Sequence, residues 1–381
     1  MISGLSFLPV LLAGLYVVWQ LGNYRGWRRA KAETDSVISD EIPPVALLVP
    51  YRNEAENLPT LLAAVSGLQR GGGQLEVYFI DDHSTDGGRT LVEQAVANAA
   101  NGPALHSLSL ADHLNGRSVV AHKKAALAYA IGKTSAEVIV TVDADCVLPE
   151  TLVSDLVRCF RAGADVVLGP VLIAPPHDNL LRAFQALDFA AYQLYTASCV
   201  RAQTPTLANG ACFAFRKELF TAVNGYAGLD HLPSGDDVLL LHRFANRPGV
   251  RFAWSNGPPV LTRPQPDWAA LWRQRIRWAG KAGEYVSPAL RYGQALAFLT
   301  ALGILVALAL TPVDPLFPAA GLLAWAMKAA VDYLLLADIV RHYGPRRLLR
   351  WYPPVQLIYP FYLTAVGVGA LLGLKTSWKG R

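Results

Sequence analysis

The sequence predicts an α/β catalytic domain with a Rossmann-like, mostly parallel mixed sheet, with one transmembrane helix before it and about three after it. Short β-branched runs alternate with helical stretches between residues 45 and 173, which is the pattern of a parallel sheet covered by helices. Hydrophobic residues make up 52% of the chain and charged residues only 17%. The apolar excess is concentrated at the two ends, which indicates membrane segments.

The charge pattern favours a membrane partner over a nucleic-acid partner. The formal net charge is +5 at pH 7, and many Lys and Arg residues flank apolar runs, where basic residues set membrane topology and contact lipid headgroups. The four cysteines have neither close pairing nor Cys-x-x-Cys spacing, so we expect buried thiols of a cytoplasmic domain and not disulfides or zinc ligands. They are Cys146, Cys159, Cys199 and Cys212.

Residues 1–22 are predicted to form an uncleaved transmembrane anchor. Ile2 to Leu21 is apolar, carries no charge and is about long enough to cross a bilayer. Basic residues follow in the stretch Arg25–Lys31, the reverse of the order in a cleaved signal peptide, which places the next part of the chain in the cytoplasm. Residues 23–43 are then a basic linker whose polar end leads into two prolines.

The catalytic domain is predicted over residues 44–265, where apolar β-rich runs alternate with helical apolar spacing. The expected strands are Val45–Val49, Leu75–Ile80, Val138–Val142 and Ala164–Ile173, the last with a bend or edge at Gly169-Pro170. The expected helical stretches are Glu54–Leu68, Leu91–Ala99, His122–Ile131 and Asn179–Val200. Acidic residues follow two of the strands, at the sheet edge where such folds bind ligands.

The pair Asp143 and Asp145 is the predicted metal site. It follows a buried strand, and two carboxylates separated by one residue repel each other unless a cation lies between them. Oxygen ligands of this kind suit Mg²⁺ or Mn²⁺, ions that in turn bind diphosphates. Asp-x-Asp alone is a short motif, and a solvated acidic turn is the alternative reading.

The C-terminal part is predicted to associate with the membrane. Residues 266–293 form an amphipathic interface segment in which Trp and apolar residues alternate with Arg and Lys. The region 294–374 then contains three apolar segments, followed by a tail at 375–381; the segments are Gln294–Leu310, Phe317–Val340 and Val355–Leu374. Lys328 and Asp332 lie four residues apart inside the middle segment and either neutralise each other or mark the interior of the bundle. The last segment contains Pro360 and either spans or re-enters the membrane.

Five motifs in this order resemble the membrane-bound inverting glycosyltransferases of family 2. They are VPYRNE at 49–54, IDDHSTDG at 80–87, Asp143-Ala-Asp145, Gly235-Asp236-Asp237 and QRIRW at 274–278. The resemblance covers roughly residues 44 to 285 and implies the GT-A fold. The family includes cellulose and hyaluronan synthases and ceramide glucosyltransferase.

The resemblance also implies a role for each matching residue. Pro50, Arg52 and Glu54 match the loop that holds the nucleotide, Asp81 or Asp82 the acid that contacts uracil and ribose, and Lys123 a lysine near the diphosphate. Asp143 and Asp145 match the metal-binding pair, with Asp145 the closer ligand. Asp237 matches the catalytic base, and Gln274, Arg277 and Trp278 match a motif near the acceptor and the diphosphate. This chain has Gly235-Asp236 where the family has Glu or Thr, which leaves Asp236 as the alternative base.

These residues lead to a prediction of function. We expect inverting transfer of a hexose or N-acetylhexosamine from a UDP-sugar to a lipid or membrane-embedded acceptor, at the cytoplasmic face of the inner membrane. Inversion is a single displacement, which needs one base for the acceptor hydroxyl and a cation for the leaving diphosphate, and the candidate residues supply both. A processive polysaccharide synthase is the main alternative. Two remote alternatives are a phosphatase of the haloacid-dehalogenase type and a non-catalytic nucleotide-sugar sensor. The Lys123-Lys124 pair has a further alternative reading, a solvated helix face.

Overall fold

The computed structural model of the chain describes residues 6–32, 39–99, 102–280 and 287–374. Their contacts divide the chain into two compact units. The sheet unit consists of Arg29–Ile173 and Cys199–Arg263, and the helical unit consists of Met1–Arg28, Ala174–Ser198 and Pro264–Arg381. Each unit is described separately below.

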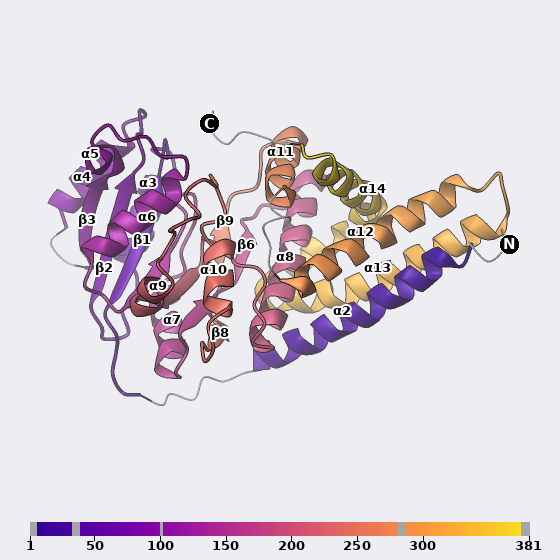
Figure 1. Cartoon of the computed structure of the whole chain (residues 1–381), viewed down its shortest axis with the longest axis horizontal. Helices are drawn as coiled ribbons and strands as arrows, with labels where there is room; N and C mark the ends of the chain where they lie inside the picture. Colours follow the sequence, from indigo (N-terminus) through magenta and orange to yellow (C-terminus); the bar gives the residue numbers. More distant parts are fainter. Residues whose placement is uncertain (1–5, 33–38, 100–101, 281–286, 375–381) are drawn as a thin grey trace. The chain divides into compact units, whose positions relative to one another are not determined.

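The sheet unit is built on a seven-stranded mixed sheet in the order β3-β2-β1-β4-β7-β5-β8 (Figure 1). The strands are β1 (Val45–Tyr51), β2 (Leu75–Asp81), β3 (Ala104–Ser109), β4 (Val138–Thr141), β5 (Val166–Leu168), β7 (Phe213–Arg216) and β8 (Phe252–Trp254). Four of the six neighbouring pairs are parallel, and only β7 runs antiparallel to its neighbours β4 and β5. A second, two-stranded sheet pairs β6 (Val171–Ile173) with β9 (Val260–Thr262). This is the mostly parallel mixed sheet that the sequence predicts.

The central strands are apolar because both faces of the sheet are covered. Residues 45–49 of β1 and 138–141 of β4 are buried without interruption, as expected for parallel strands between helical layers. The covering helices are α3 (Leu58–Ser66), α4 (Gly88–Ala97), α5 (Leu110–Leu114), α6 (His122–Lys133), α7 (Leu152–Arg161), α9 (Lys217–Ala222) and α10 (Val238–Ala245). Loops therefore emerge at defined strand ends, which is what positions the polar residues discussed below.

Two parts of the sheet unit differ from the sequence prediction. The expected single strand Ala164–Ile173 is two strands, because Gly169-Pro170 interrupts it and β5 and β6 then pair in different sheets. The edge strand β3 was not predicted. It is only half-buried and carries His106 and Ser107 among its apolar residues, so its apolar pattern is weak.

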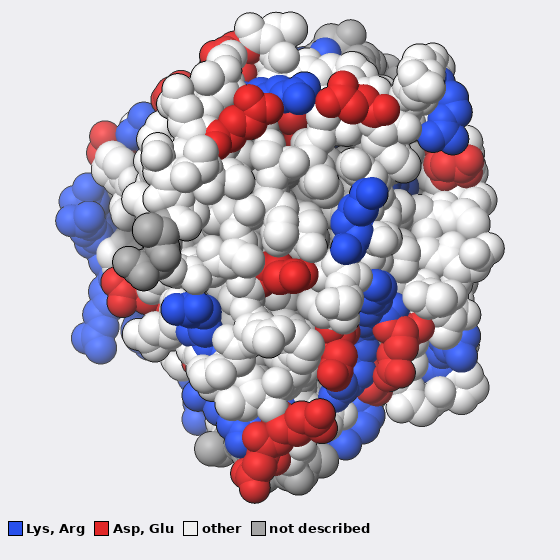
Figure 2. All heavy atoms as spheres, turned by 90° about the vertical axis from the view of Figure 1, so that its left-hand side faces the viewer, with Lys and Arg blue, Asp and Glu red and all other residues white. Residues whose placement is uncertain are grey.

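Acidic and basic side chains are intermixed on the face of the sheet unit that carries β2, β3 and α5. Figure 2 shows this face, where charges of both signs are scattered over a larger uncharged surface. Nucleic-acid binding uses a basic patch or stripe, and the described residues form no such patch on the face shown.

The helical unit contains three helices that are long and apolar enough to cross a membrane. These spans, found among the described residues, are Pro288–Ala309, Leu316–Tyr343 and Arg346–Leu371. They correspond to α12 (Pro288–Ala309), α13 (Leu316–Tyr343) and the pair η2 (Arg346–Trp351) and α14 (Tyr352–Leu371). The same unit includes α11 (Trp268–Ala279) and most of α2 (Leu8–Ala32) and α8 (Leu180–Arg201).

Two helices of this unit differ from their predicted form. The predicted anchor is part of α2, which extends to Ala32 and is not among the three spans, because its second half carries polar residues such as Gln20, Asn23 and Arg25. Most of α8 groups with the helical unit and not with the catalytic domain to which the sequence analysis assigned it. Residues 281–286 of the predicted amphipathic segment and the tail at 375–381 lie outside the described residues.

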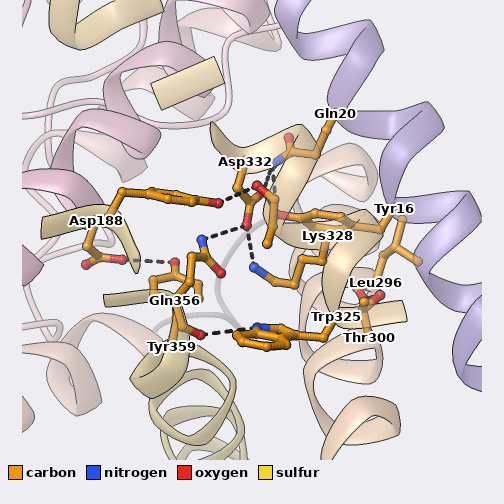
Figure 3. A network of polar contacts seen from close by, with 12 residues as sticks. Tyr16, Gln20, Asp188, Leu296, Thr300, Trp325, Lys328, Asp332, Gln356 and Tyr359 are labelled. Carbon is orange, nitrogen blue, oxygen red and sulfur yellow. Dashed lines mark hydrogen bonds and ion pairs between the residues drawn. The ribbon is translucent and has the colours of Figure 1, made fainter. Parts of the chain in front are cut away.

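The two charged residues Lys328 and Asp332 of α13 lie inside a polar network (Figure 3). Lys328 Nζ donates to Asp332 Oδ2 at 2.5 Å, and Tyr16 OH donates to Asp332 Oδ1 at 2.8 Å. Gln356 Nε2 also donates to Asp332, and the Lys328 ammonium lies 4.7 Å from the centre of the Tyr359 ring. Lys328 is completely buried. The two residues therefore neutralise each other and also lie in the interior of the helical unit, so both readings that the sequence allows hold for this pair.

Candidate active site

The loops that follow β1 and β2 are bound to each other. Asn53 Oδ1 accepts a hydrogen bond of 2.8 Å from the Thr85 amide, and the Asn53 amide donates to Ser84 Oγ at 3.0 Å. The Ala55 amide donates to Asp86 Oδ2 at 2.7 Å. Residues 49–54 and 80–87, which the sequence analysis treats as separate motifs, therefore form one hydrogen-bonded surface at the carboxyl ends of β1 and β2.

The predicted metal pair lies where the strand order of the sheet reverses. The chain passes outward from β1 to β2 and β3 and then returns to place β4 on the other side of β1. Ligands of open α/β sheets bind at the carboxyl ends of the strands at such a point. Asp143 and Asp145 follow β4 there, beside the β1 loop, and Pro50 lies within β1, paired with Ile80.

The surroundings of Asp145 favour a cation. Burial, the neighbouring Asp143 carboxylate and the Glu54 carboxylate together raise the pKa of Asp145 to about 6. A divalent cation between these oxygens would relieve that repulsion, so Asp143, Asp145 and Glu54 fit the hard-cation site that the sequence predicts. The influence of Glu54 on Asp145 also shows that two of the predicted motifs lie close together.

Lys123 connects the metal pair to the acidic motif. Its Nζ lies 2.7 Å from Asp143 Oδ1 and 3.0 Å from Asp236 Oδ2. Burial lowers the pKa of the Lys123 ammonium, but the attraction of Asp143 and of the acidic pair 236–237 outweighs burial and raises that pKa well above its ordinary value. A fixed positive charge therefore lies among the carboxylates, where a diphosphate would need it.

Gly210 and Asp237 complete this cluster. The Gly210 amide donates to Asp237 Oδ2 at 3.0 Å, and Asp237 Oδ1 accepts from the Val238 amide at 2.7 Å, which caps α10. A Cβ atom at Gly210 would lie 2.9 Å from Lys123 Nζ. Only glycine leaves Lys123 its present position, and the turn at Asn209-Gly210 was the sole sequence signal for this residue.

Lys124 holds the loop that precedes the acidic motif. Its ammonium donates to three carbonyl oxygens, those of Leu229 at 3.0 Å, Leu232 at 2.6 Å and Ser234 at 2.9 Å. Lys124 is 2% exposed, so the reading of Lys123-Lys124 as a solvated helix face is wrong for this residue. Adjacent lysines of α6 thus act on both sides of Asp236, one on its carboxylate and one on its preceding backbone.

The two aspartates that end β2 have different partners. Asp81 Oδ1 accepts a hydrogen bond of 3.1 Å from the Ser84 amide. Asp82 Oδ1 lies 2.8 Å from Nδ1 of His83 and 2.8 Å from Nδ1 of His122. The structure thus gathers two histidines around one carboxylate oxygen.

The QRIRW motif lies on α11, in the helical unit. Arg275 and Ile276 are its buried residues, and Arg275 is the one that carries a charge. It donates through Nη1 to Gln274 Oε1 at 2.8 Å and lies over the Trp278 ring at 4.4 Å. Gln274, Arg277 and Trp278, the residues predicted to face acceptor and diphosphate, are half-buried. Arg275 therefore organises the motif from within.

A single acid anchors Arg275. Asp188 Oδ2 accepts from Arg275 Nη2 at 2.8 Å and from Nε at 3.1 Å, while Asp188 Oδ1 accepts from Tyr359 OH at 3.0 Å. Asp188 is a lone acid in the aromatic-apolar stretch Asn179–Val200. That isolation was the available sequence signal, and the sequence analysis did not use it.

The chain belongs to the glycosyltransferase like family 2, whose model matches residues 43–281. This matched region contains all five motifs.

The GT-A fold that the resemblance implies is confirmed by similarity to a solved structure, the mannosyltransferase from Pyrobaculum calidifontis in complex with GDP-mannose and Mn²⁺. That structure superimposes with a TM-score of 0.58 at 20% identity and covers 97% of this chain and 98% of its own.

Curated relatives match a shorter region. The undecaprenyl-phosphate 4-deoxy-4-formamido-L-arabinose transferase of Yersinia enterocolitica is 31% identical over 130 residues, which is 34% of this chain and 37% of the relative. The enzyme of the same name from Pectobacterium carotovorum is 29% identical over 129 residues, with the same shares. The match thus spans little more than a third of either relative.

Proposed function

We propose that this family 2 glycosyltransferase transfers a sugar, with inversion, from a UDP-sugar to a lipid acceptor in the membrane. The observation that carries the proposal is the position of Lys123, which joins a metal-binding carboxylate to the acidic motif. In this arrangement donor diphosphate, cation and base are neighbours, as a single displacement requires.

Seven residues of the sheet unit have a role in the proposed mechanism. Asp143 and Asp145 would hold Mg²⁺ or Mn²⁺, which would supply charge neutralisation for the departing diphosphate. Lys123 binds the same diphosphate as a fixed cation. Arg52, Glu54 and Asp81 form the nucleotide side of the site. Asp237 accepts the proton of the acceptor hydroxyl as the acceptor oxygen bonds to the anomeric carbon and the bond to the diphosphate breaks.

The residues of the helical unit are proposed to serve the acceptor. Trp278 offers an aromatic face for a sugar ring, while Gln274 and Arg277 supply hydrogen bonds and charge. Asp188 and Arg275 keep this motif in place. We further propose that the catalytic residues face the cytoplasm, on the basis of the basic stretch Arg25–Lys31.

A lipid acceptor is favoured over a growing polymer by the chemistry of the spans. A channel for a hydrated polysaccharide needs polar and aromatic residues that face water, whereas Lys328 is fully buried and bonded to Asp332. The two charged side chains of α13 thus pair with each other inside the helical unit and do not face water. The relatives in Yersinia and Pectobacterium are named for transfer involving undecaprenyl phosphate, which makes that lipid the first acceptor to test.

The decisive experiment is product analysis. Detergent-purified full-length protein is incubated with Mg²⁺ or Mn²⁺, membrane lipids and radiolabelled UDP-glucose, UDP-galactose or UDP-N-acetylglucosamine, with GDP-mannose as the comparison donor. We expect label from a UDP-sugar in an organic-extractable product. Label in a water-soluble polymer would establish the processive alternative, and label from GDP-mannose alone would overturn the proposed donor.

A further inference from the structure

The sheet unit holds a second cluster of ligand atoms, which follows β2 and differs in chemistry from the Asp143–Asp145 pair after β4. Asp82, His83 and His122 each offer one ligand atom, and these three atoms all lie within 4.8 Å of one another. His83 comes from the loop after β2, and His122 is the first residue of α6. Two elements distant in sequence therefore bring three metal-ligating side chains to one point.

The geometry of the cluster is that of a partly open site. Both imidazole nitrogens lie 2.8 Å from the same oxygen, Asp82 Oδ1. The exposed fractions of the side chains are 7% for Asp82, 17% for His122 and 38% for His83. The carboxylate is thus buried while the imidazoles border solvent, which leaves a direction from which an ion and a further ligand can enter.

Hydrogen bonds alone would make a specific demand on the histidines. For both rings to donate to one oxygen, both must carry a proton on Nδ1. A metal ion would instead bind both rings through deprotonated Nδ1 atoms. The two nitrogen lone pairs and the carboxylate oxygen would then all coordinate the same ion, which accounts for their close approach. His83 also has φ = 59°, a conformation that is costly for a residue with a side chain and that is concentrated at functional sites.

We propose that Asp82, His83 and His122 bind a Zn²⁺-type transition-metal ion, separate from the cation at Asp143 and Asp145. Two imidazoles and one carboxylate are ligands for zinc, cobalt or iron, whereas Mg²⁺ selects oxygen ligands. Three protein ligands leave a coordination position open to water or to a donor group. The assignment gives Asp82 to the ion and leaves Asp81 for the nucleotide. It does not depend on the proposed donor or acceptor.

Cobalt absorption tests the site directly. The full-length D143N/D145N variant, which lacks the carboxylate pair, is stripped with EDTA in detergent and titrated with CoCl₂. We expect visible d–d bands that saturate at one Co²⁺ per chain. H83Q and H122Q in this background should each weaken Co²⁺ binding by at least about 100-fold, since a direct ligand matters no less than an outer-shell partner. H231Q, which replaces an exposed histidine of the same unit, should bind as its parent does.

Glutamine distinguishes coordination from hydrogen bonding, because its amide can still donate to Asp82 but is a poor ligand for zinc. Zn²⁺ should raise the melting temperature of the D143N/D145N parent and leave that of the two glutamine variants unchanged. X-ray absorption of the zinc-loaded parent needs no histidine variant and should show two imidazole nitrogens. Absence of saturable Co²⁺ binding, unchanged binding in H83Q, or a zinc shell made only of oxygen would each overturn the proposal.

Discussion

The guanidinium of Arg275 donates to the carboxylate of Asp188 at 2.8 Å, and the two side chains are only 3% and 0% exposed. A buried ion pair contributes little net stability when it is compared with an apolar pair, but removing one partner leaves an uncompensated charge. The Gln274 and Trp278 side chains both contact Arg275. Disturbing Asp188 should therefore affect the stability of the helical unit and the shape of the QRIRW motif together.

We predict that D188A destabilises the protein by about 3–5 kcal/mol, because Arg275 remains buried without its partner. The double variant D188L/R275M should recover most of this loss. D178N is the matched control, since the Asp178–Arg182 pair is exposed and should contribute less than about 1 kcal/mol. Thermal unfolding in detergent measures all three. Equal melting temperatures for D188A and D178N would show that leaving Arg275 buried without Asp188 does not destabilise the protein.

Sequence reasoning located most of the sheet unit because the central strands are continuous apolar runs that end at acids. Asp143 and Asp145 could be placed at a strand end from such a run alone. The sequence could not reveal that Gly169-Pro170 sends β5 and β6 into different sheets, because strand pairing is a non-local property. The edge strand β3 lacks the apolar pattern that identified its neighbours.

The supporting residues were the harder part of the site to foresee. Lys124 and Lys123 are adjacent and chemically identical, and only the path of the loop over 229–234 makes one a backbone clamp and the other a partner of carboxylates. Asp188 looks from its sequence like an isolated acid in an apolar helix. Its partner Arg275 is separated from it by 87 residues, and a long-range pair of this kind leaves no periodic signal.

Metal removal should abolish transfer. D145A should lower the turnover rate by orders of magnitude, as loss of a catalytic metal's ligand does, and Mg²⁺ or Mn²⁺ should restore EDTA-treated wild-type enzyme but not D145A. The control is D112N, whose carboxylate is 70% exposed. The measurement is release of radiolabelled sugar from the donor. Full activity in the presence of EDTA is the result that this prediction does not allow.

Gly210 provides a test of Lys123 that avoids removing the lysine. In G210A the new Cβ would lie 2.9 Å from Lys123 Nζ and 3.3 Å from Asp236 Oδ2, so the end of the long lysine side chain has to shift while the rest of the fold keeps its packing. We expect a melting temperature near that of wild type and a weakening of UDP binding by about 10-fold, equivalent to the 1.4 kcal/mol loss of one charge-assisted contact. Isothermal titration calorimetry with UDP and Mn²⁺ gives the affinity. G132A is the control, because nothing lies near a Cβ at that position of α6.

The identity of the base can be tested together with the class of acceptor. Asp237 is bonded to the Gly210 and Val238 amides, whereas Asp236 is bonded to Lys123. A base must be held in place with access to the acceptor, and a carboxylate that is paired with the diphosphate-binding lysine is less available for that task. We therefore expect D237N to bind UDP normally and to lose about 10²-fold or more in transfer rate to a hydroxyl acceptor. D236N should instead weaken donor binding through Lys123.

A phosphate acceptor has a second pKa near 6, so it is mostly ionised at neutral pH and needs little help from a base. Rates are measured with a lipid alcohol and with undecaprenyl phosphate in parallel. A large loss for D236N with an active D237N on the alcohol would move the base by one residue, and equal rates of D237N and wild type on both lipids would remove the base role from Asp237.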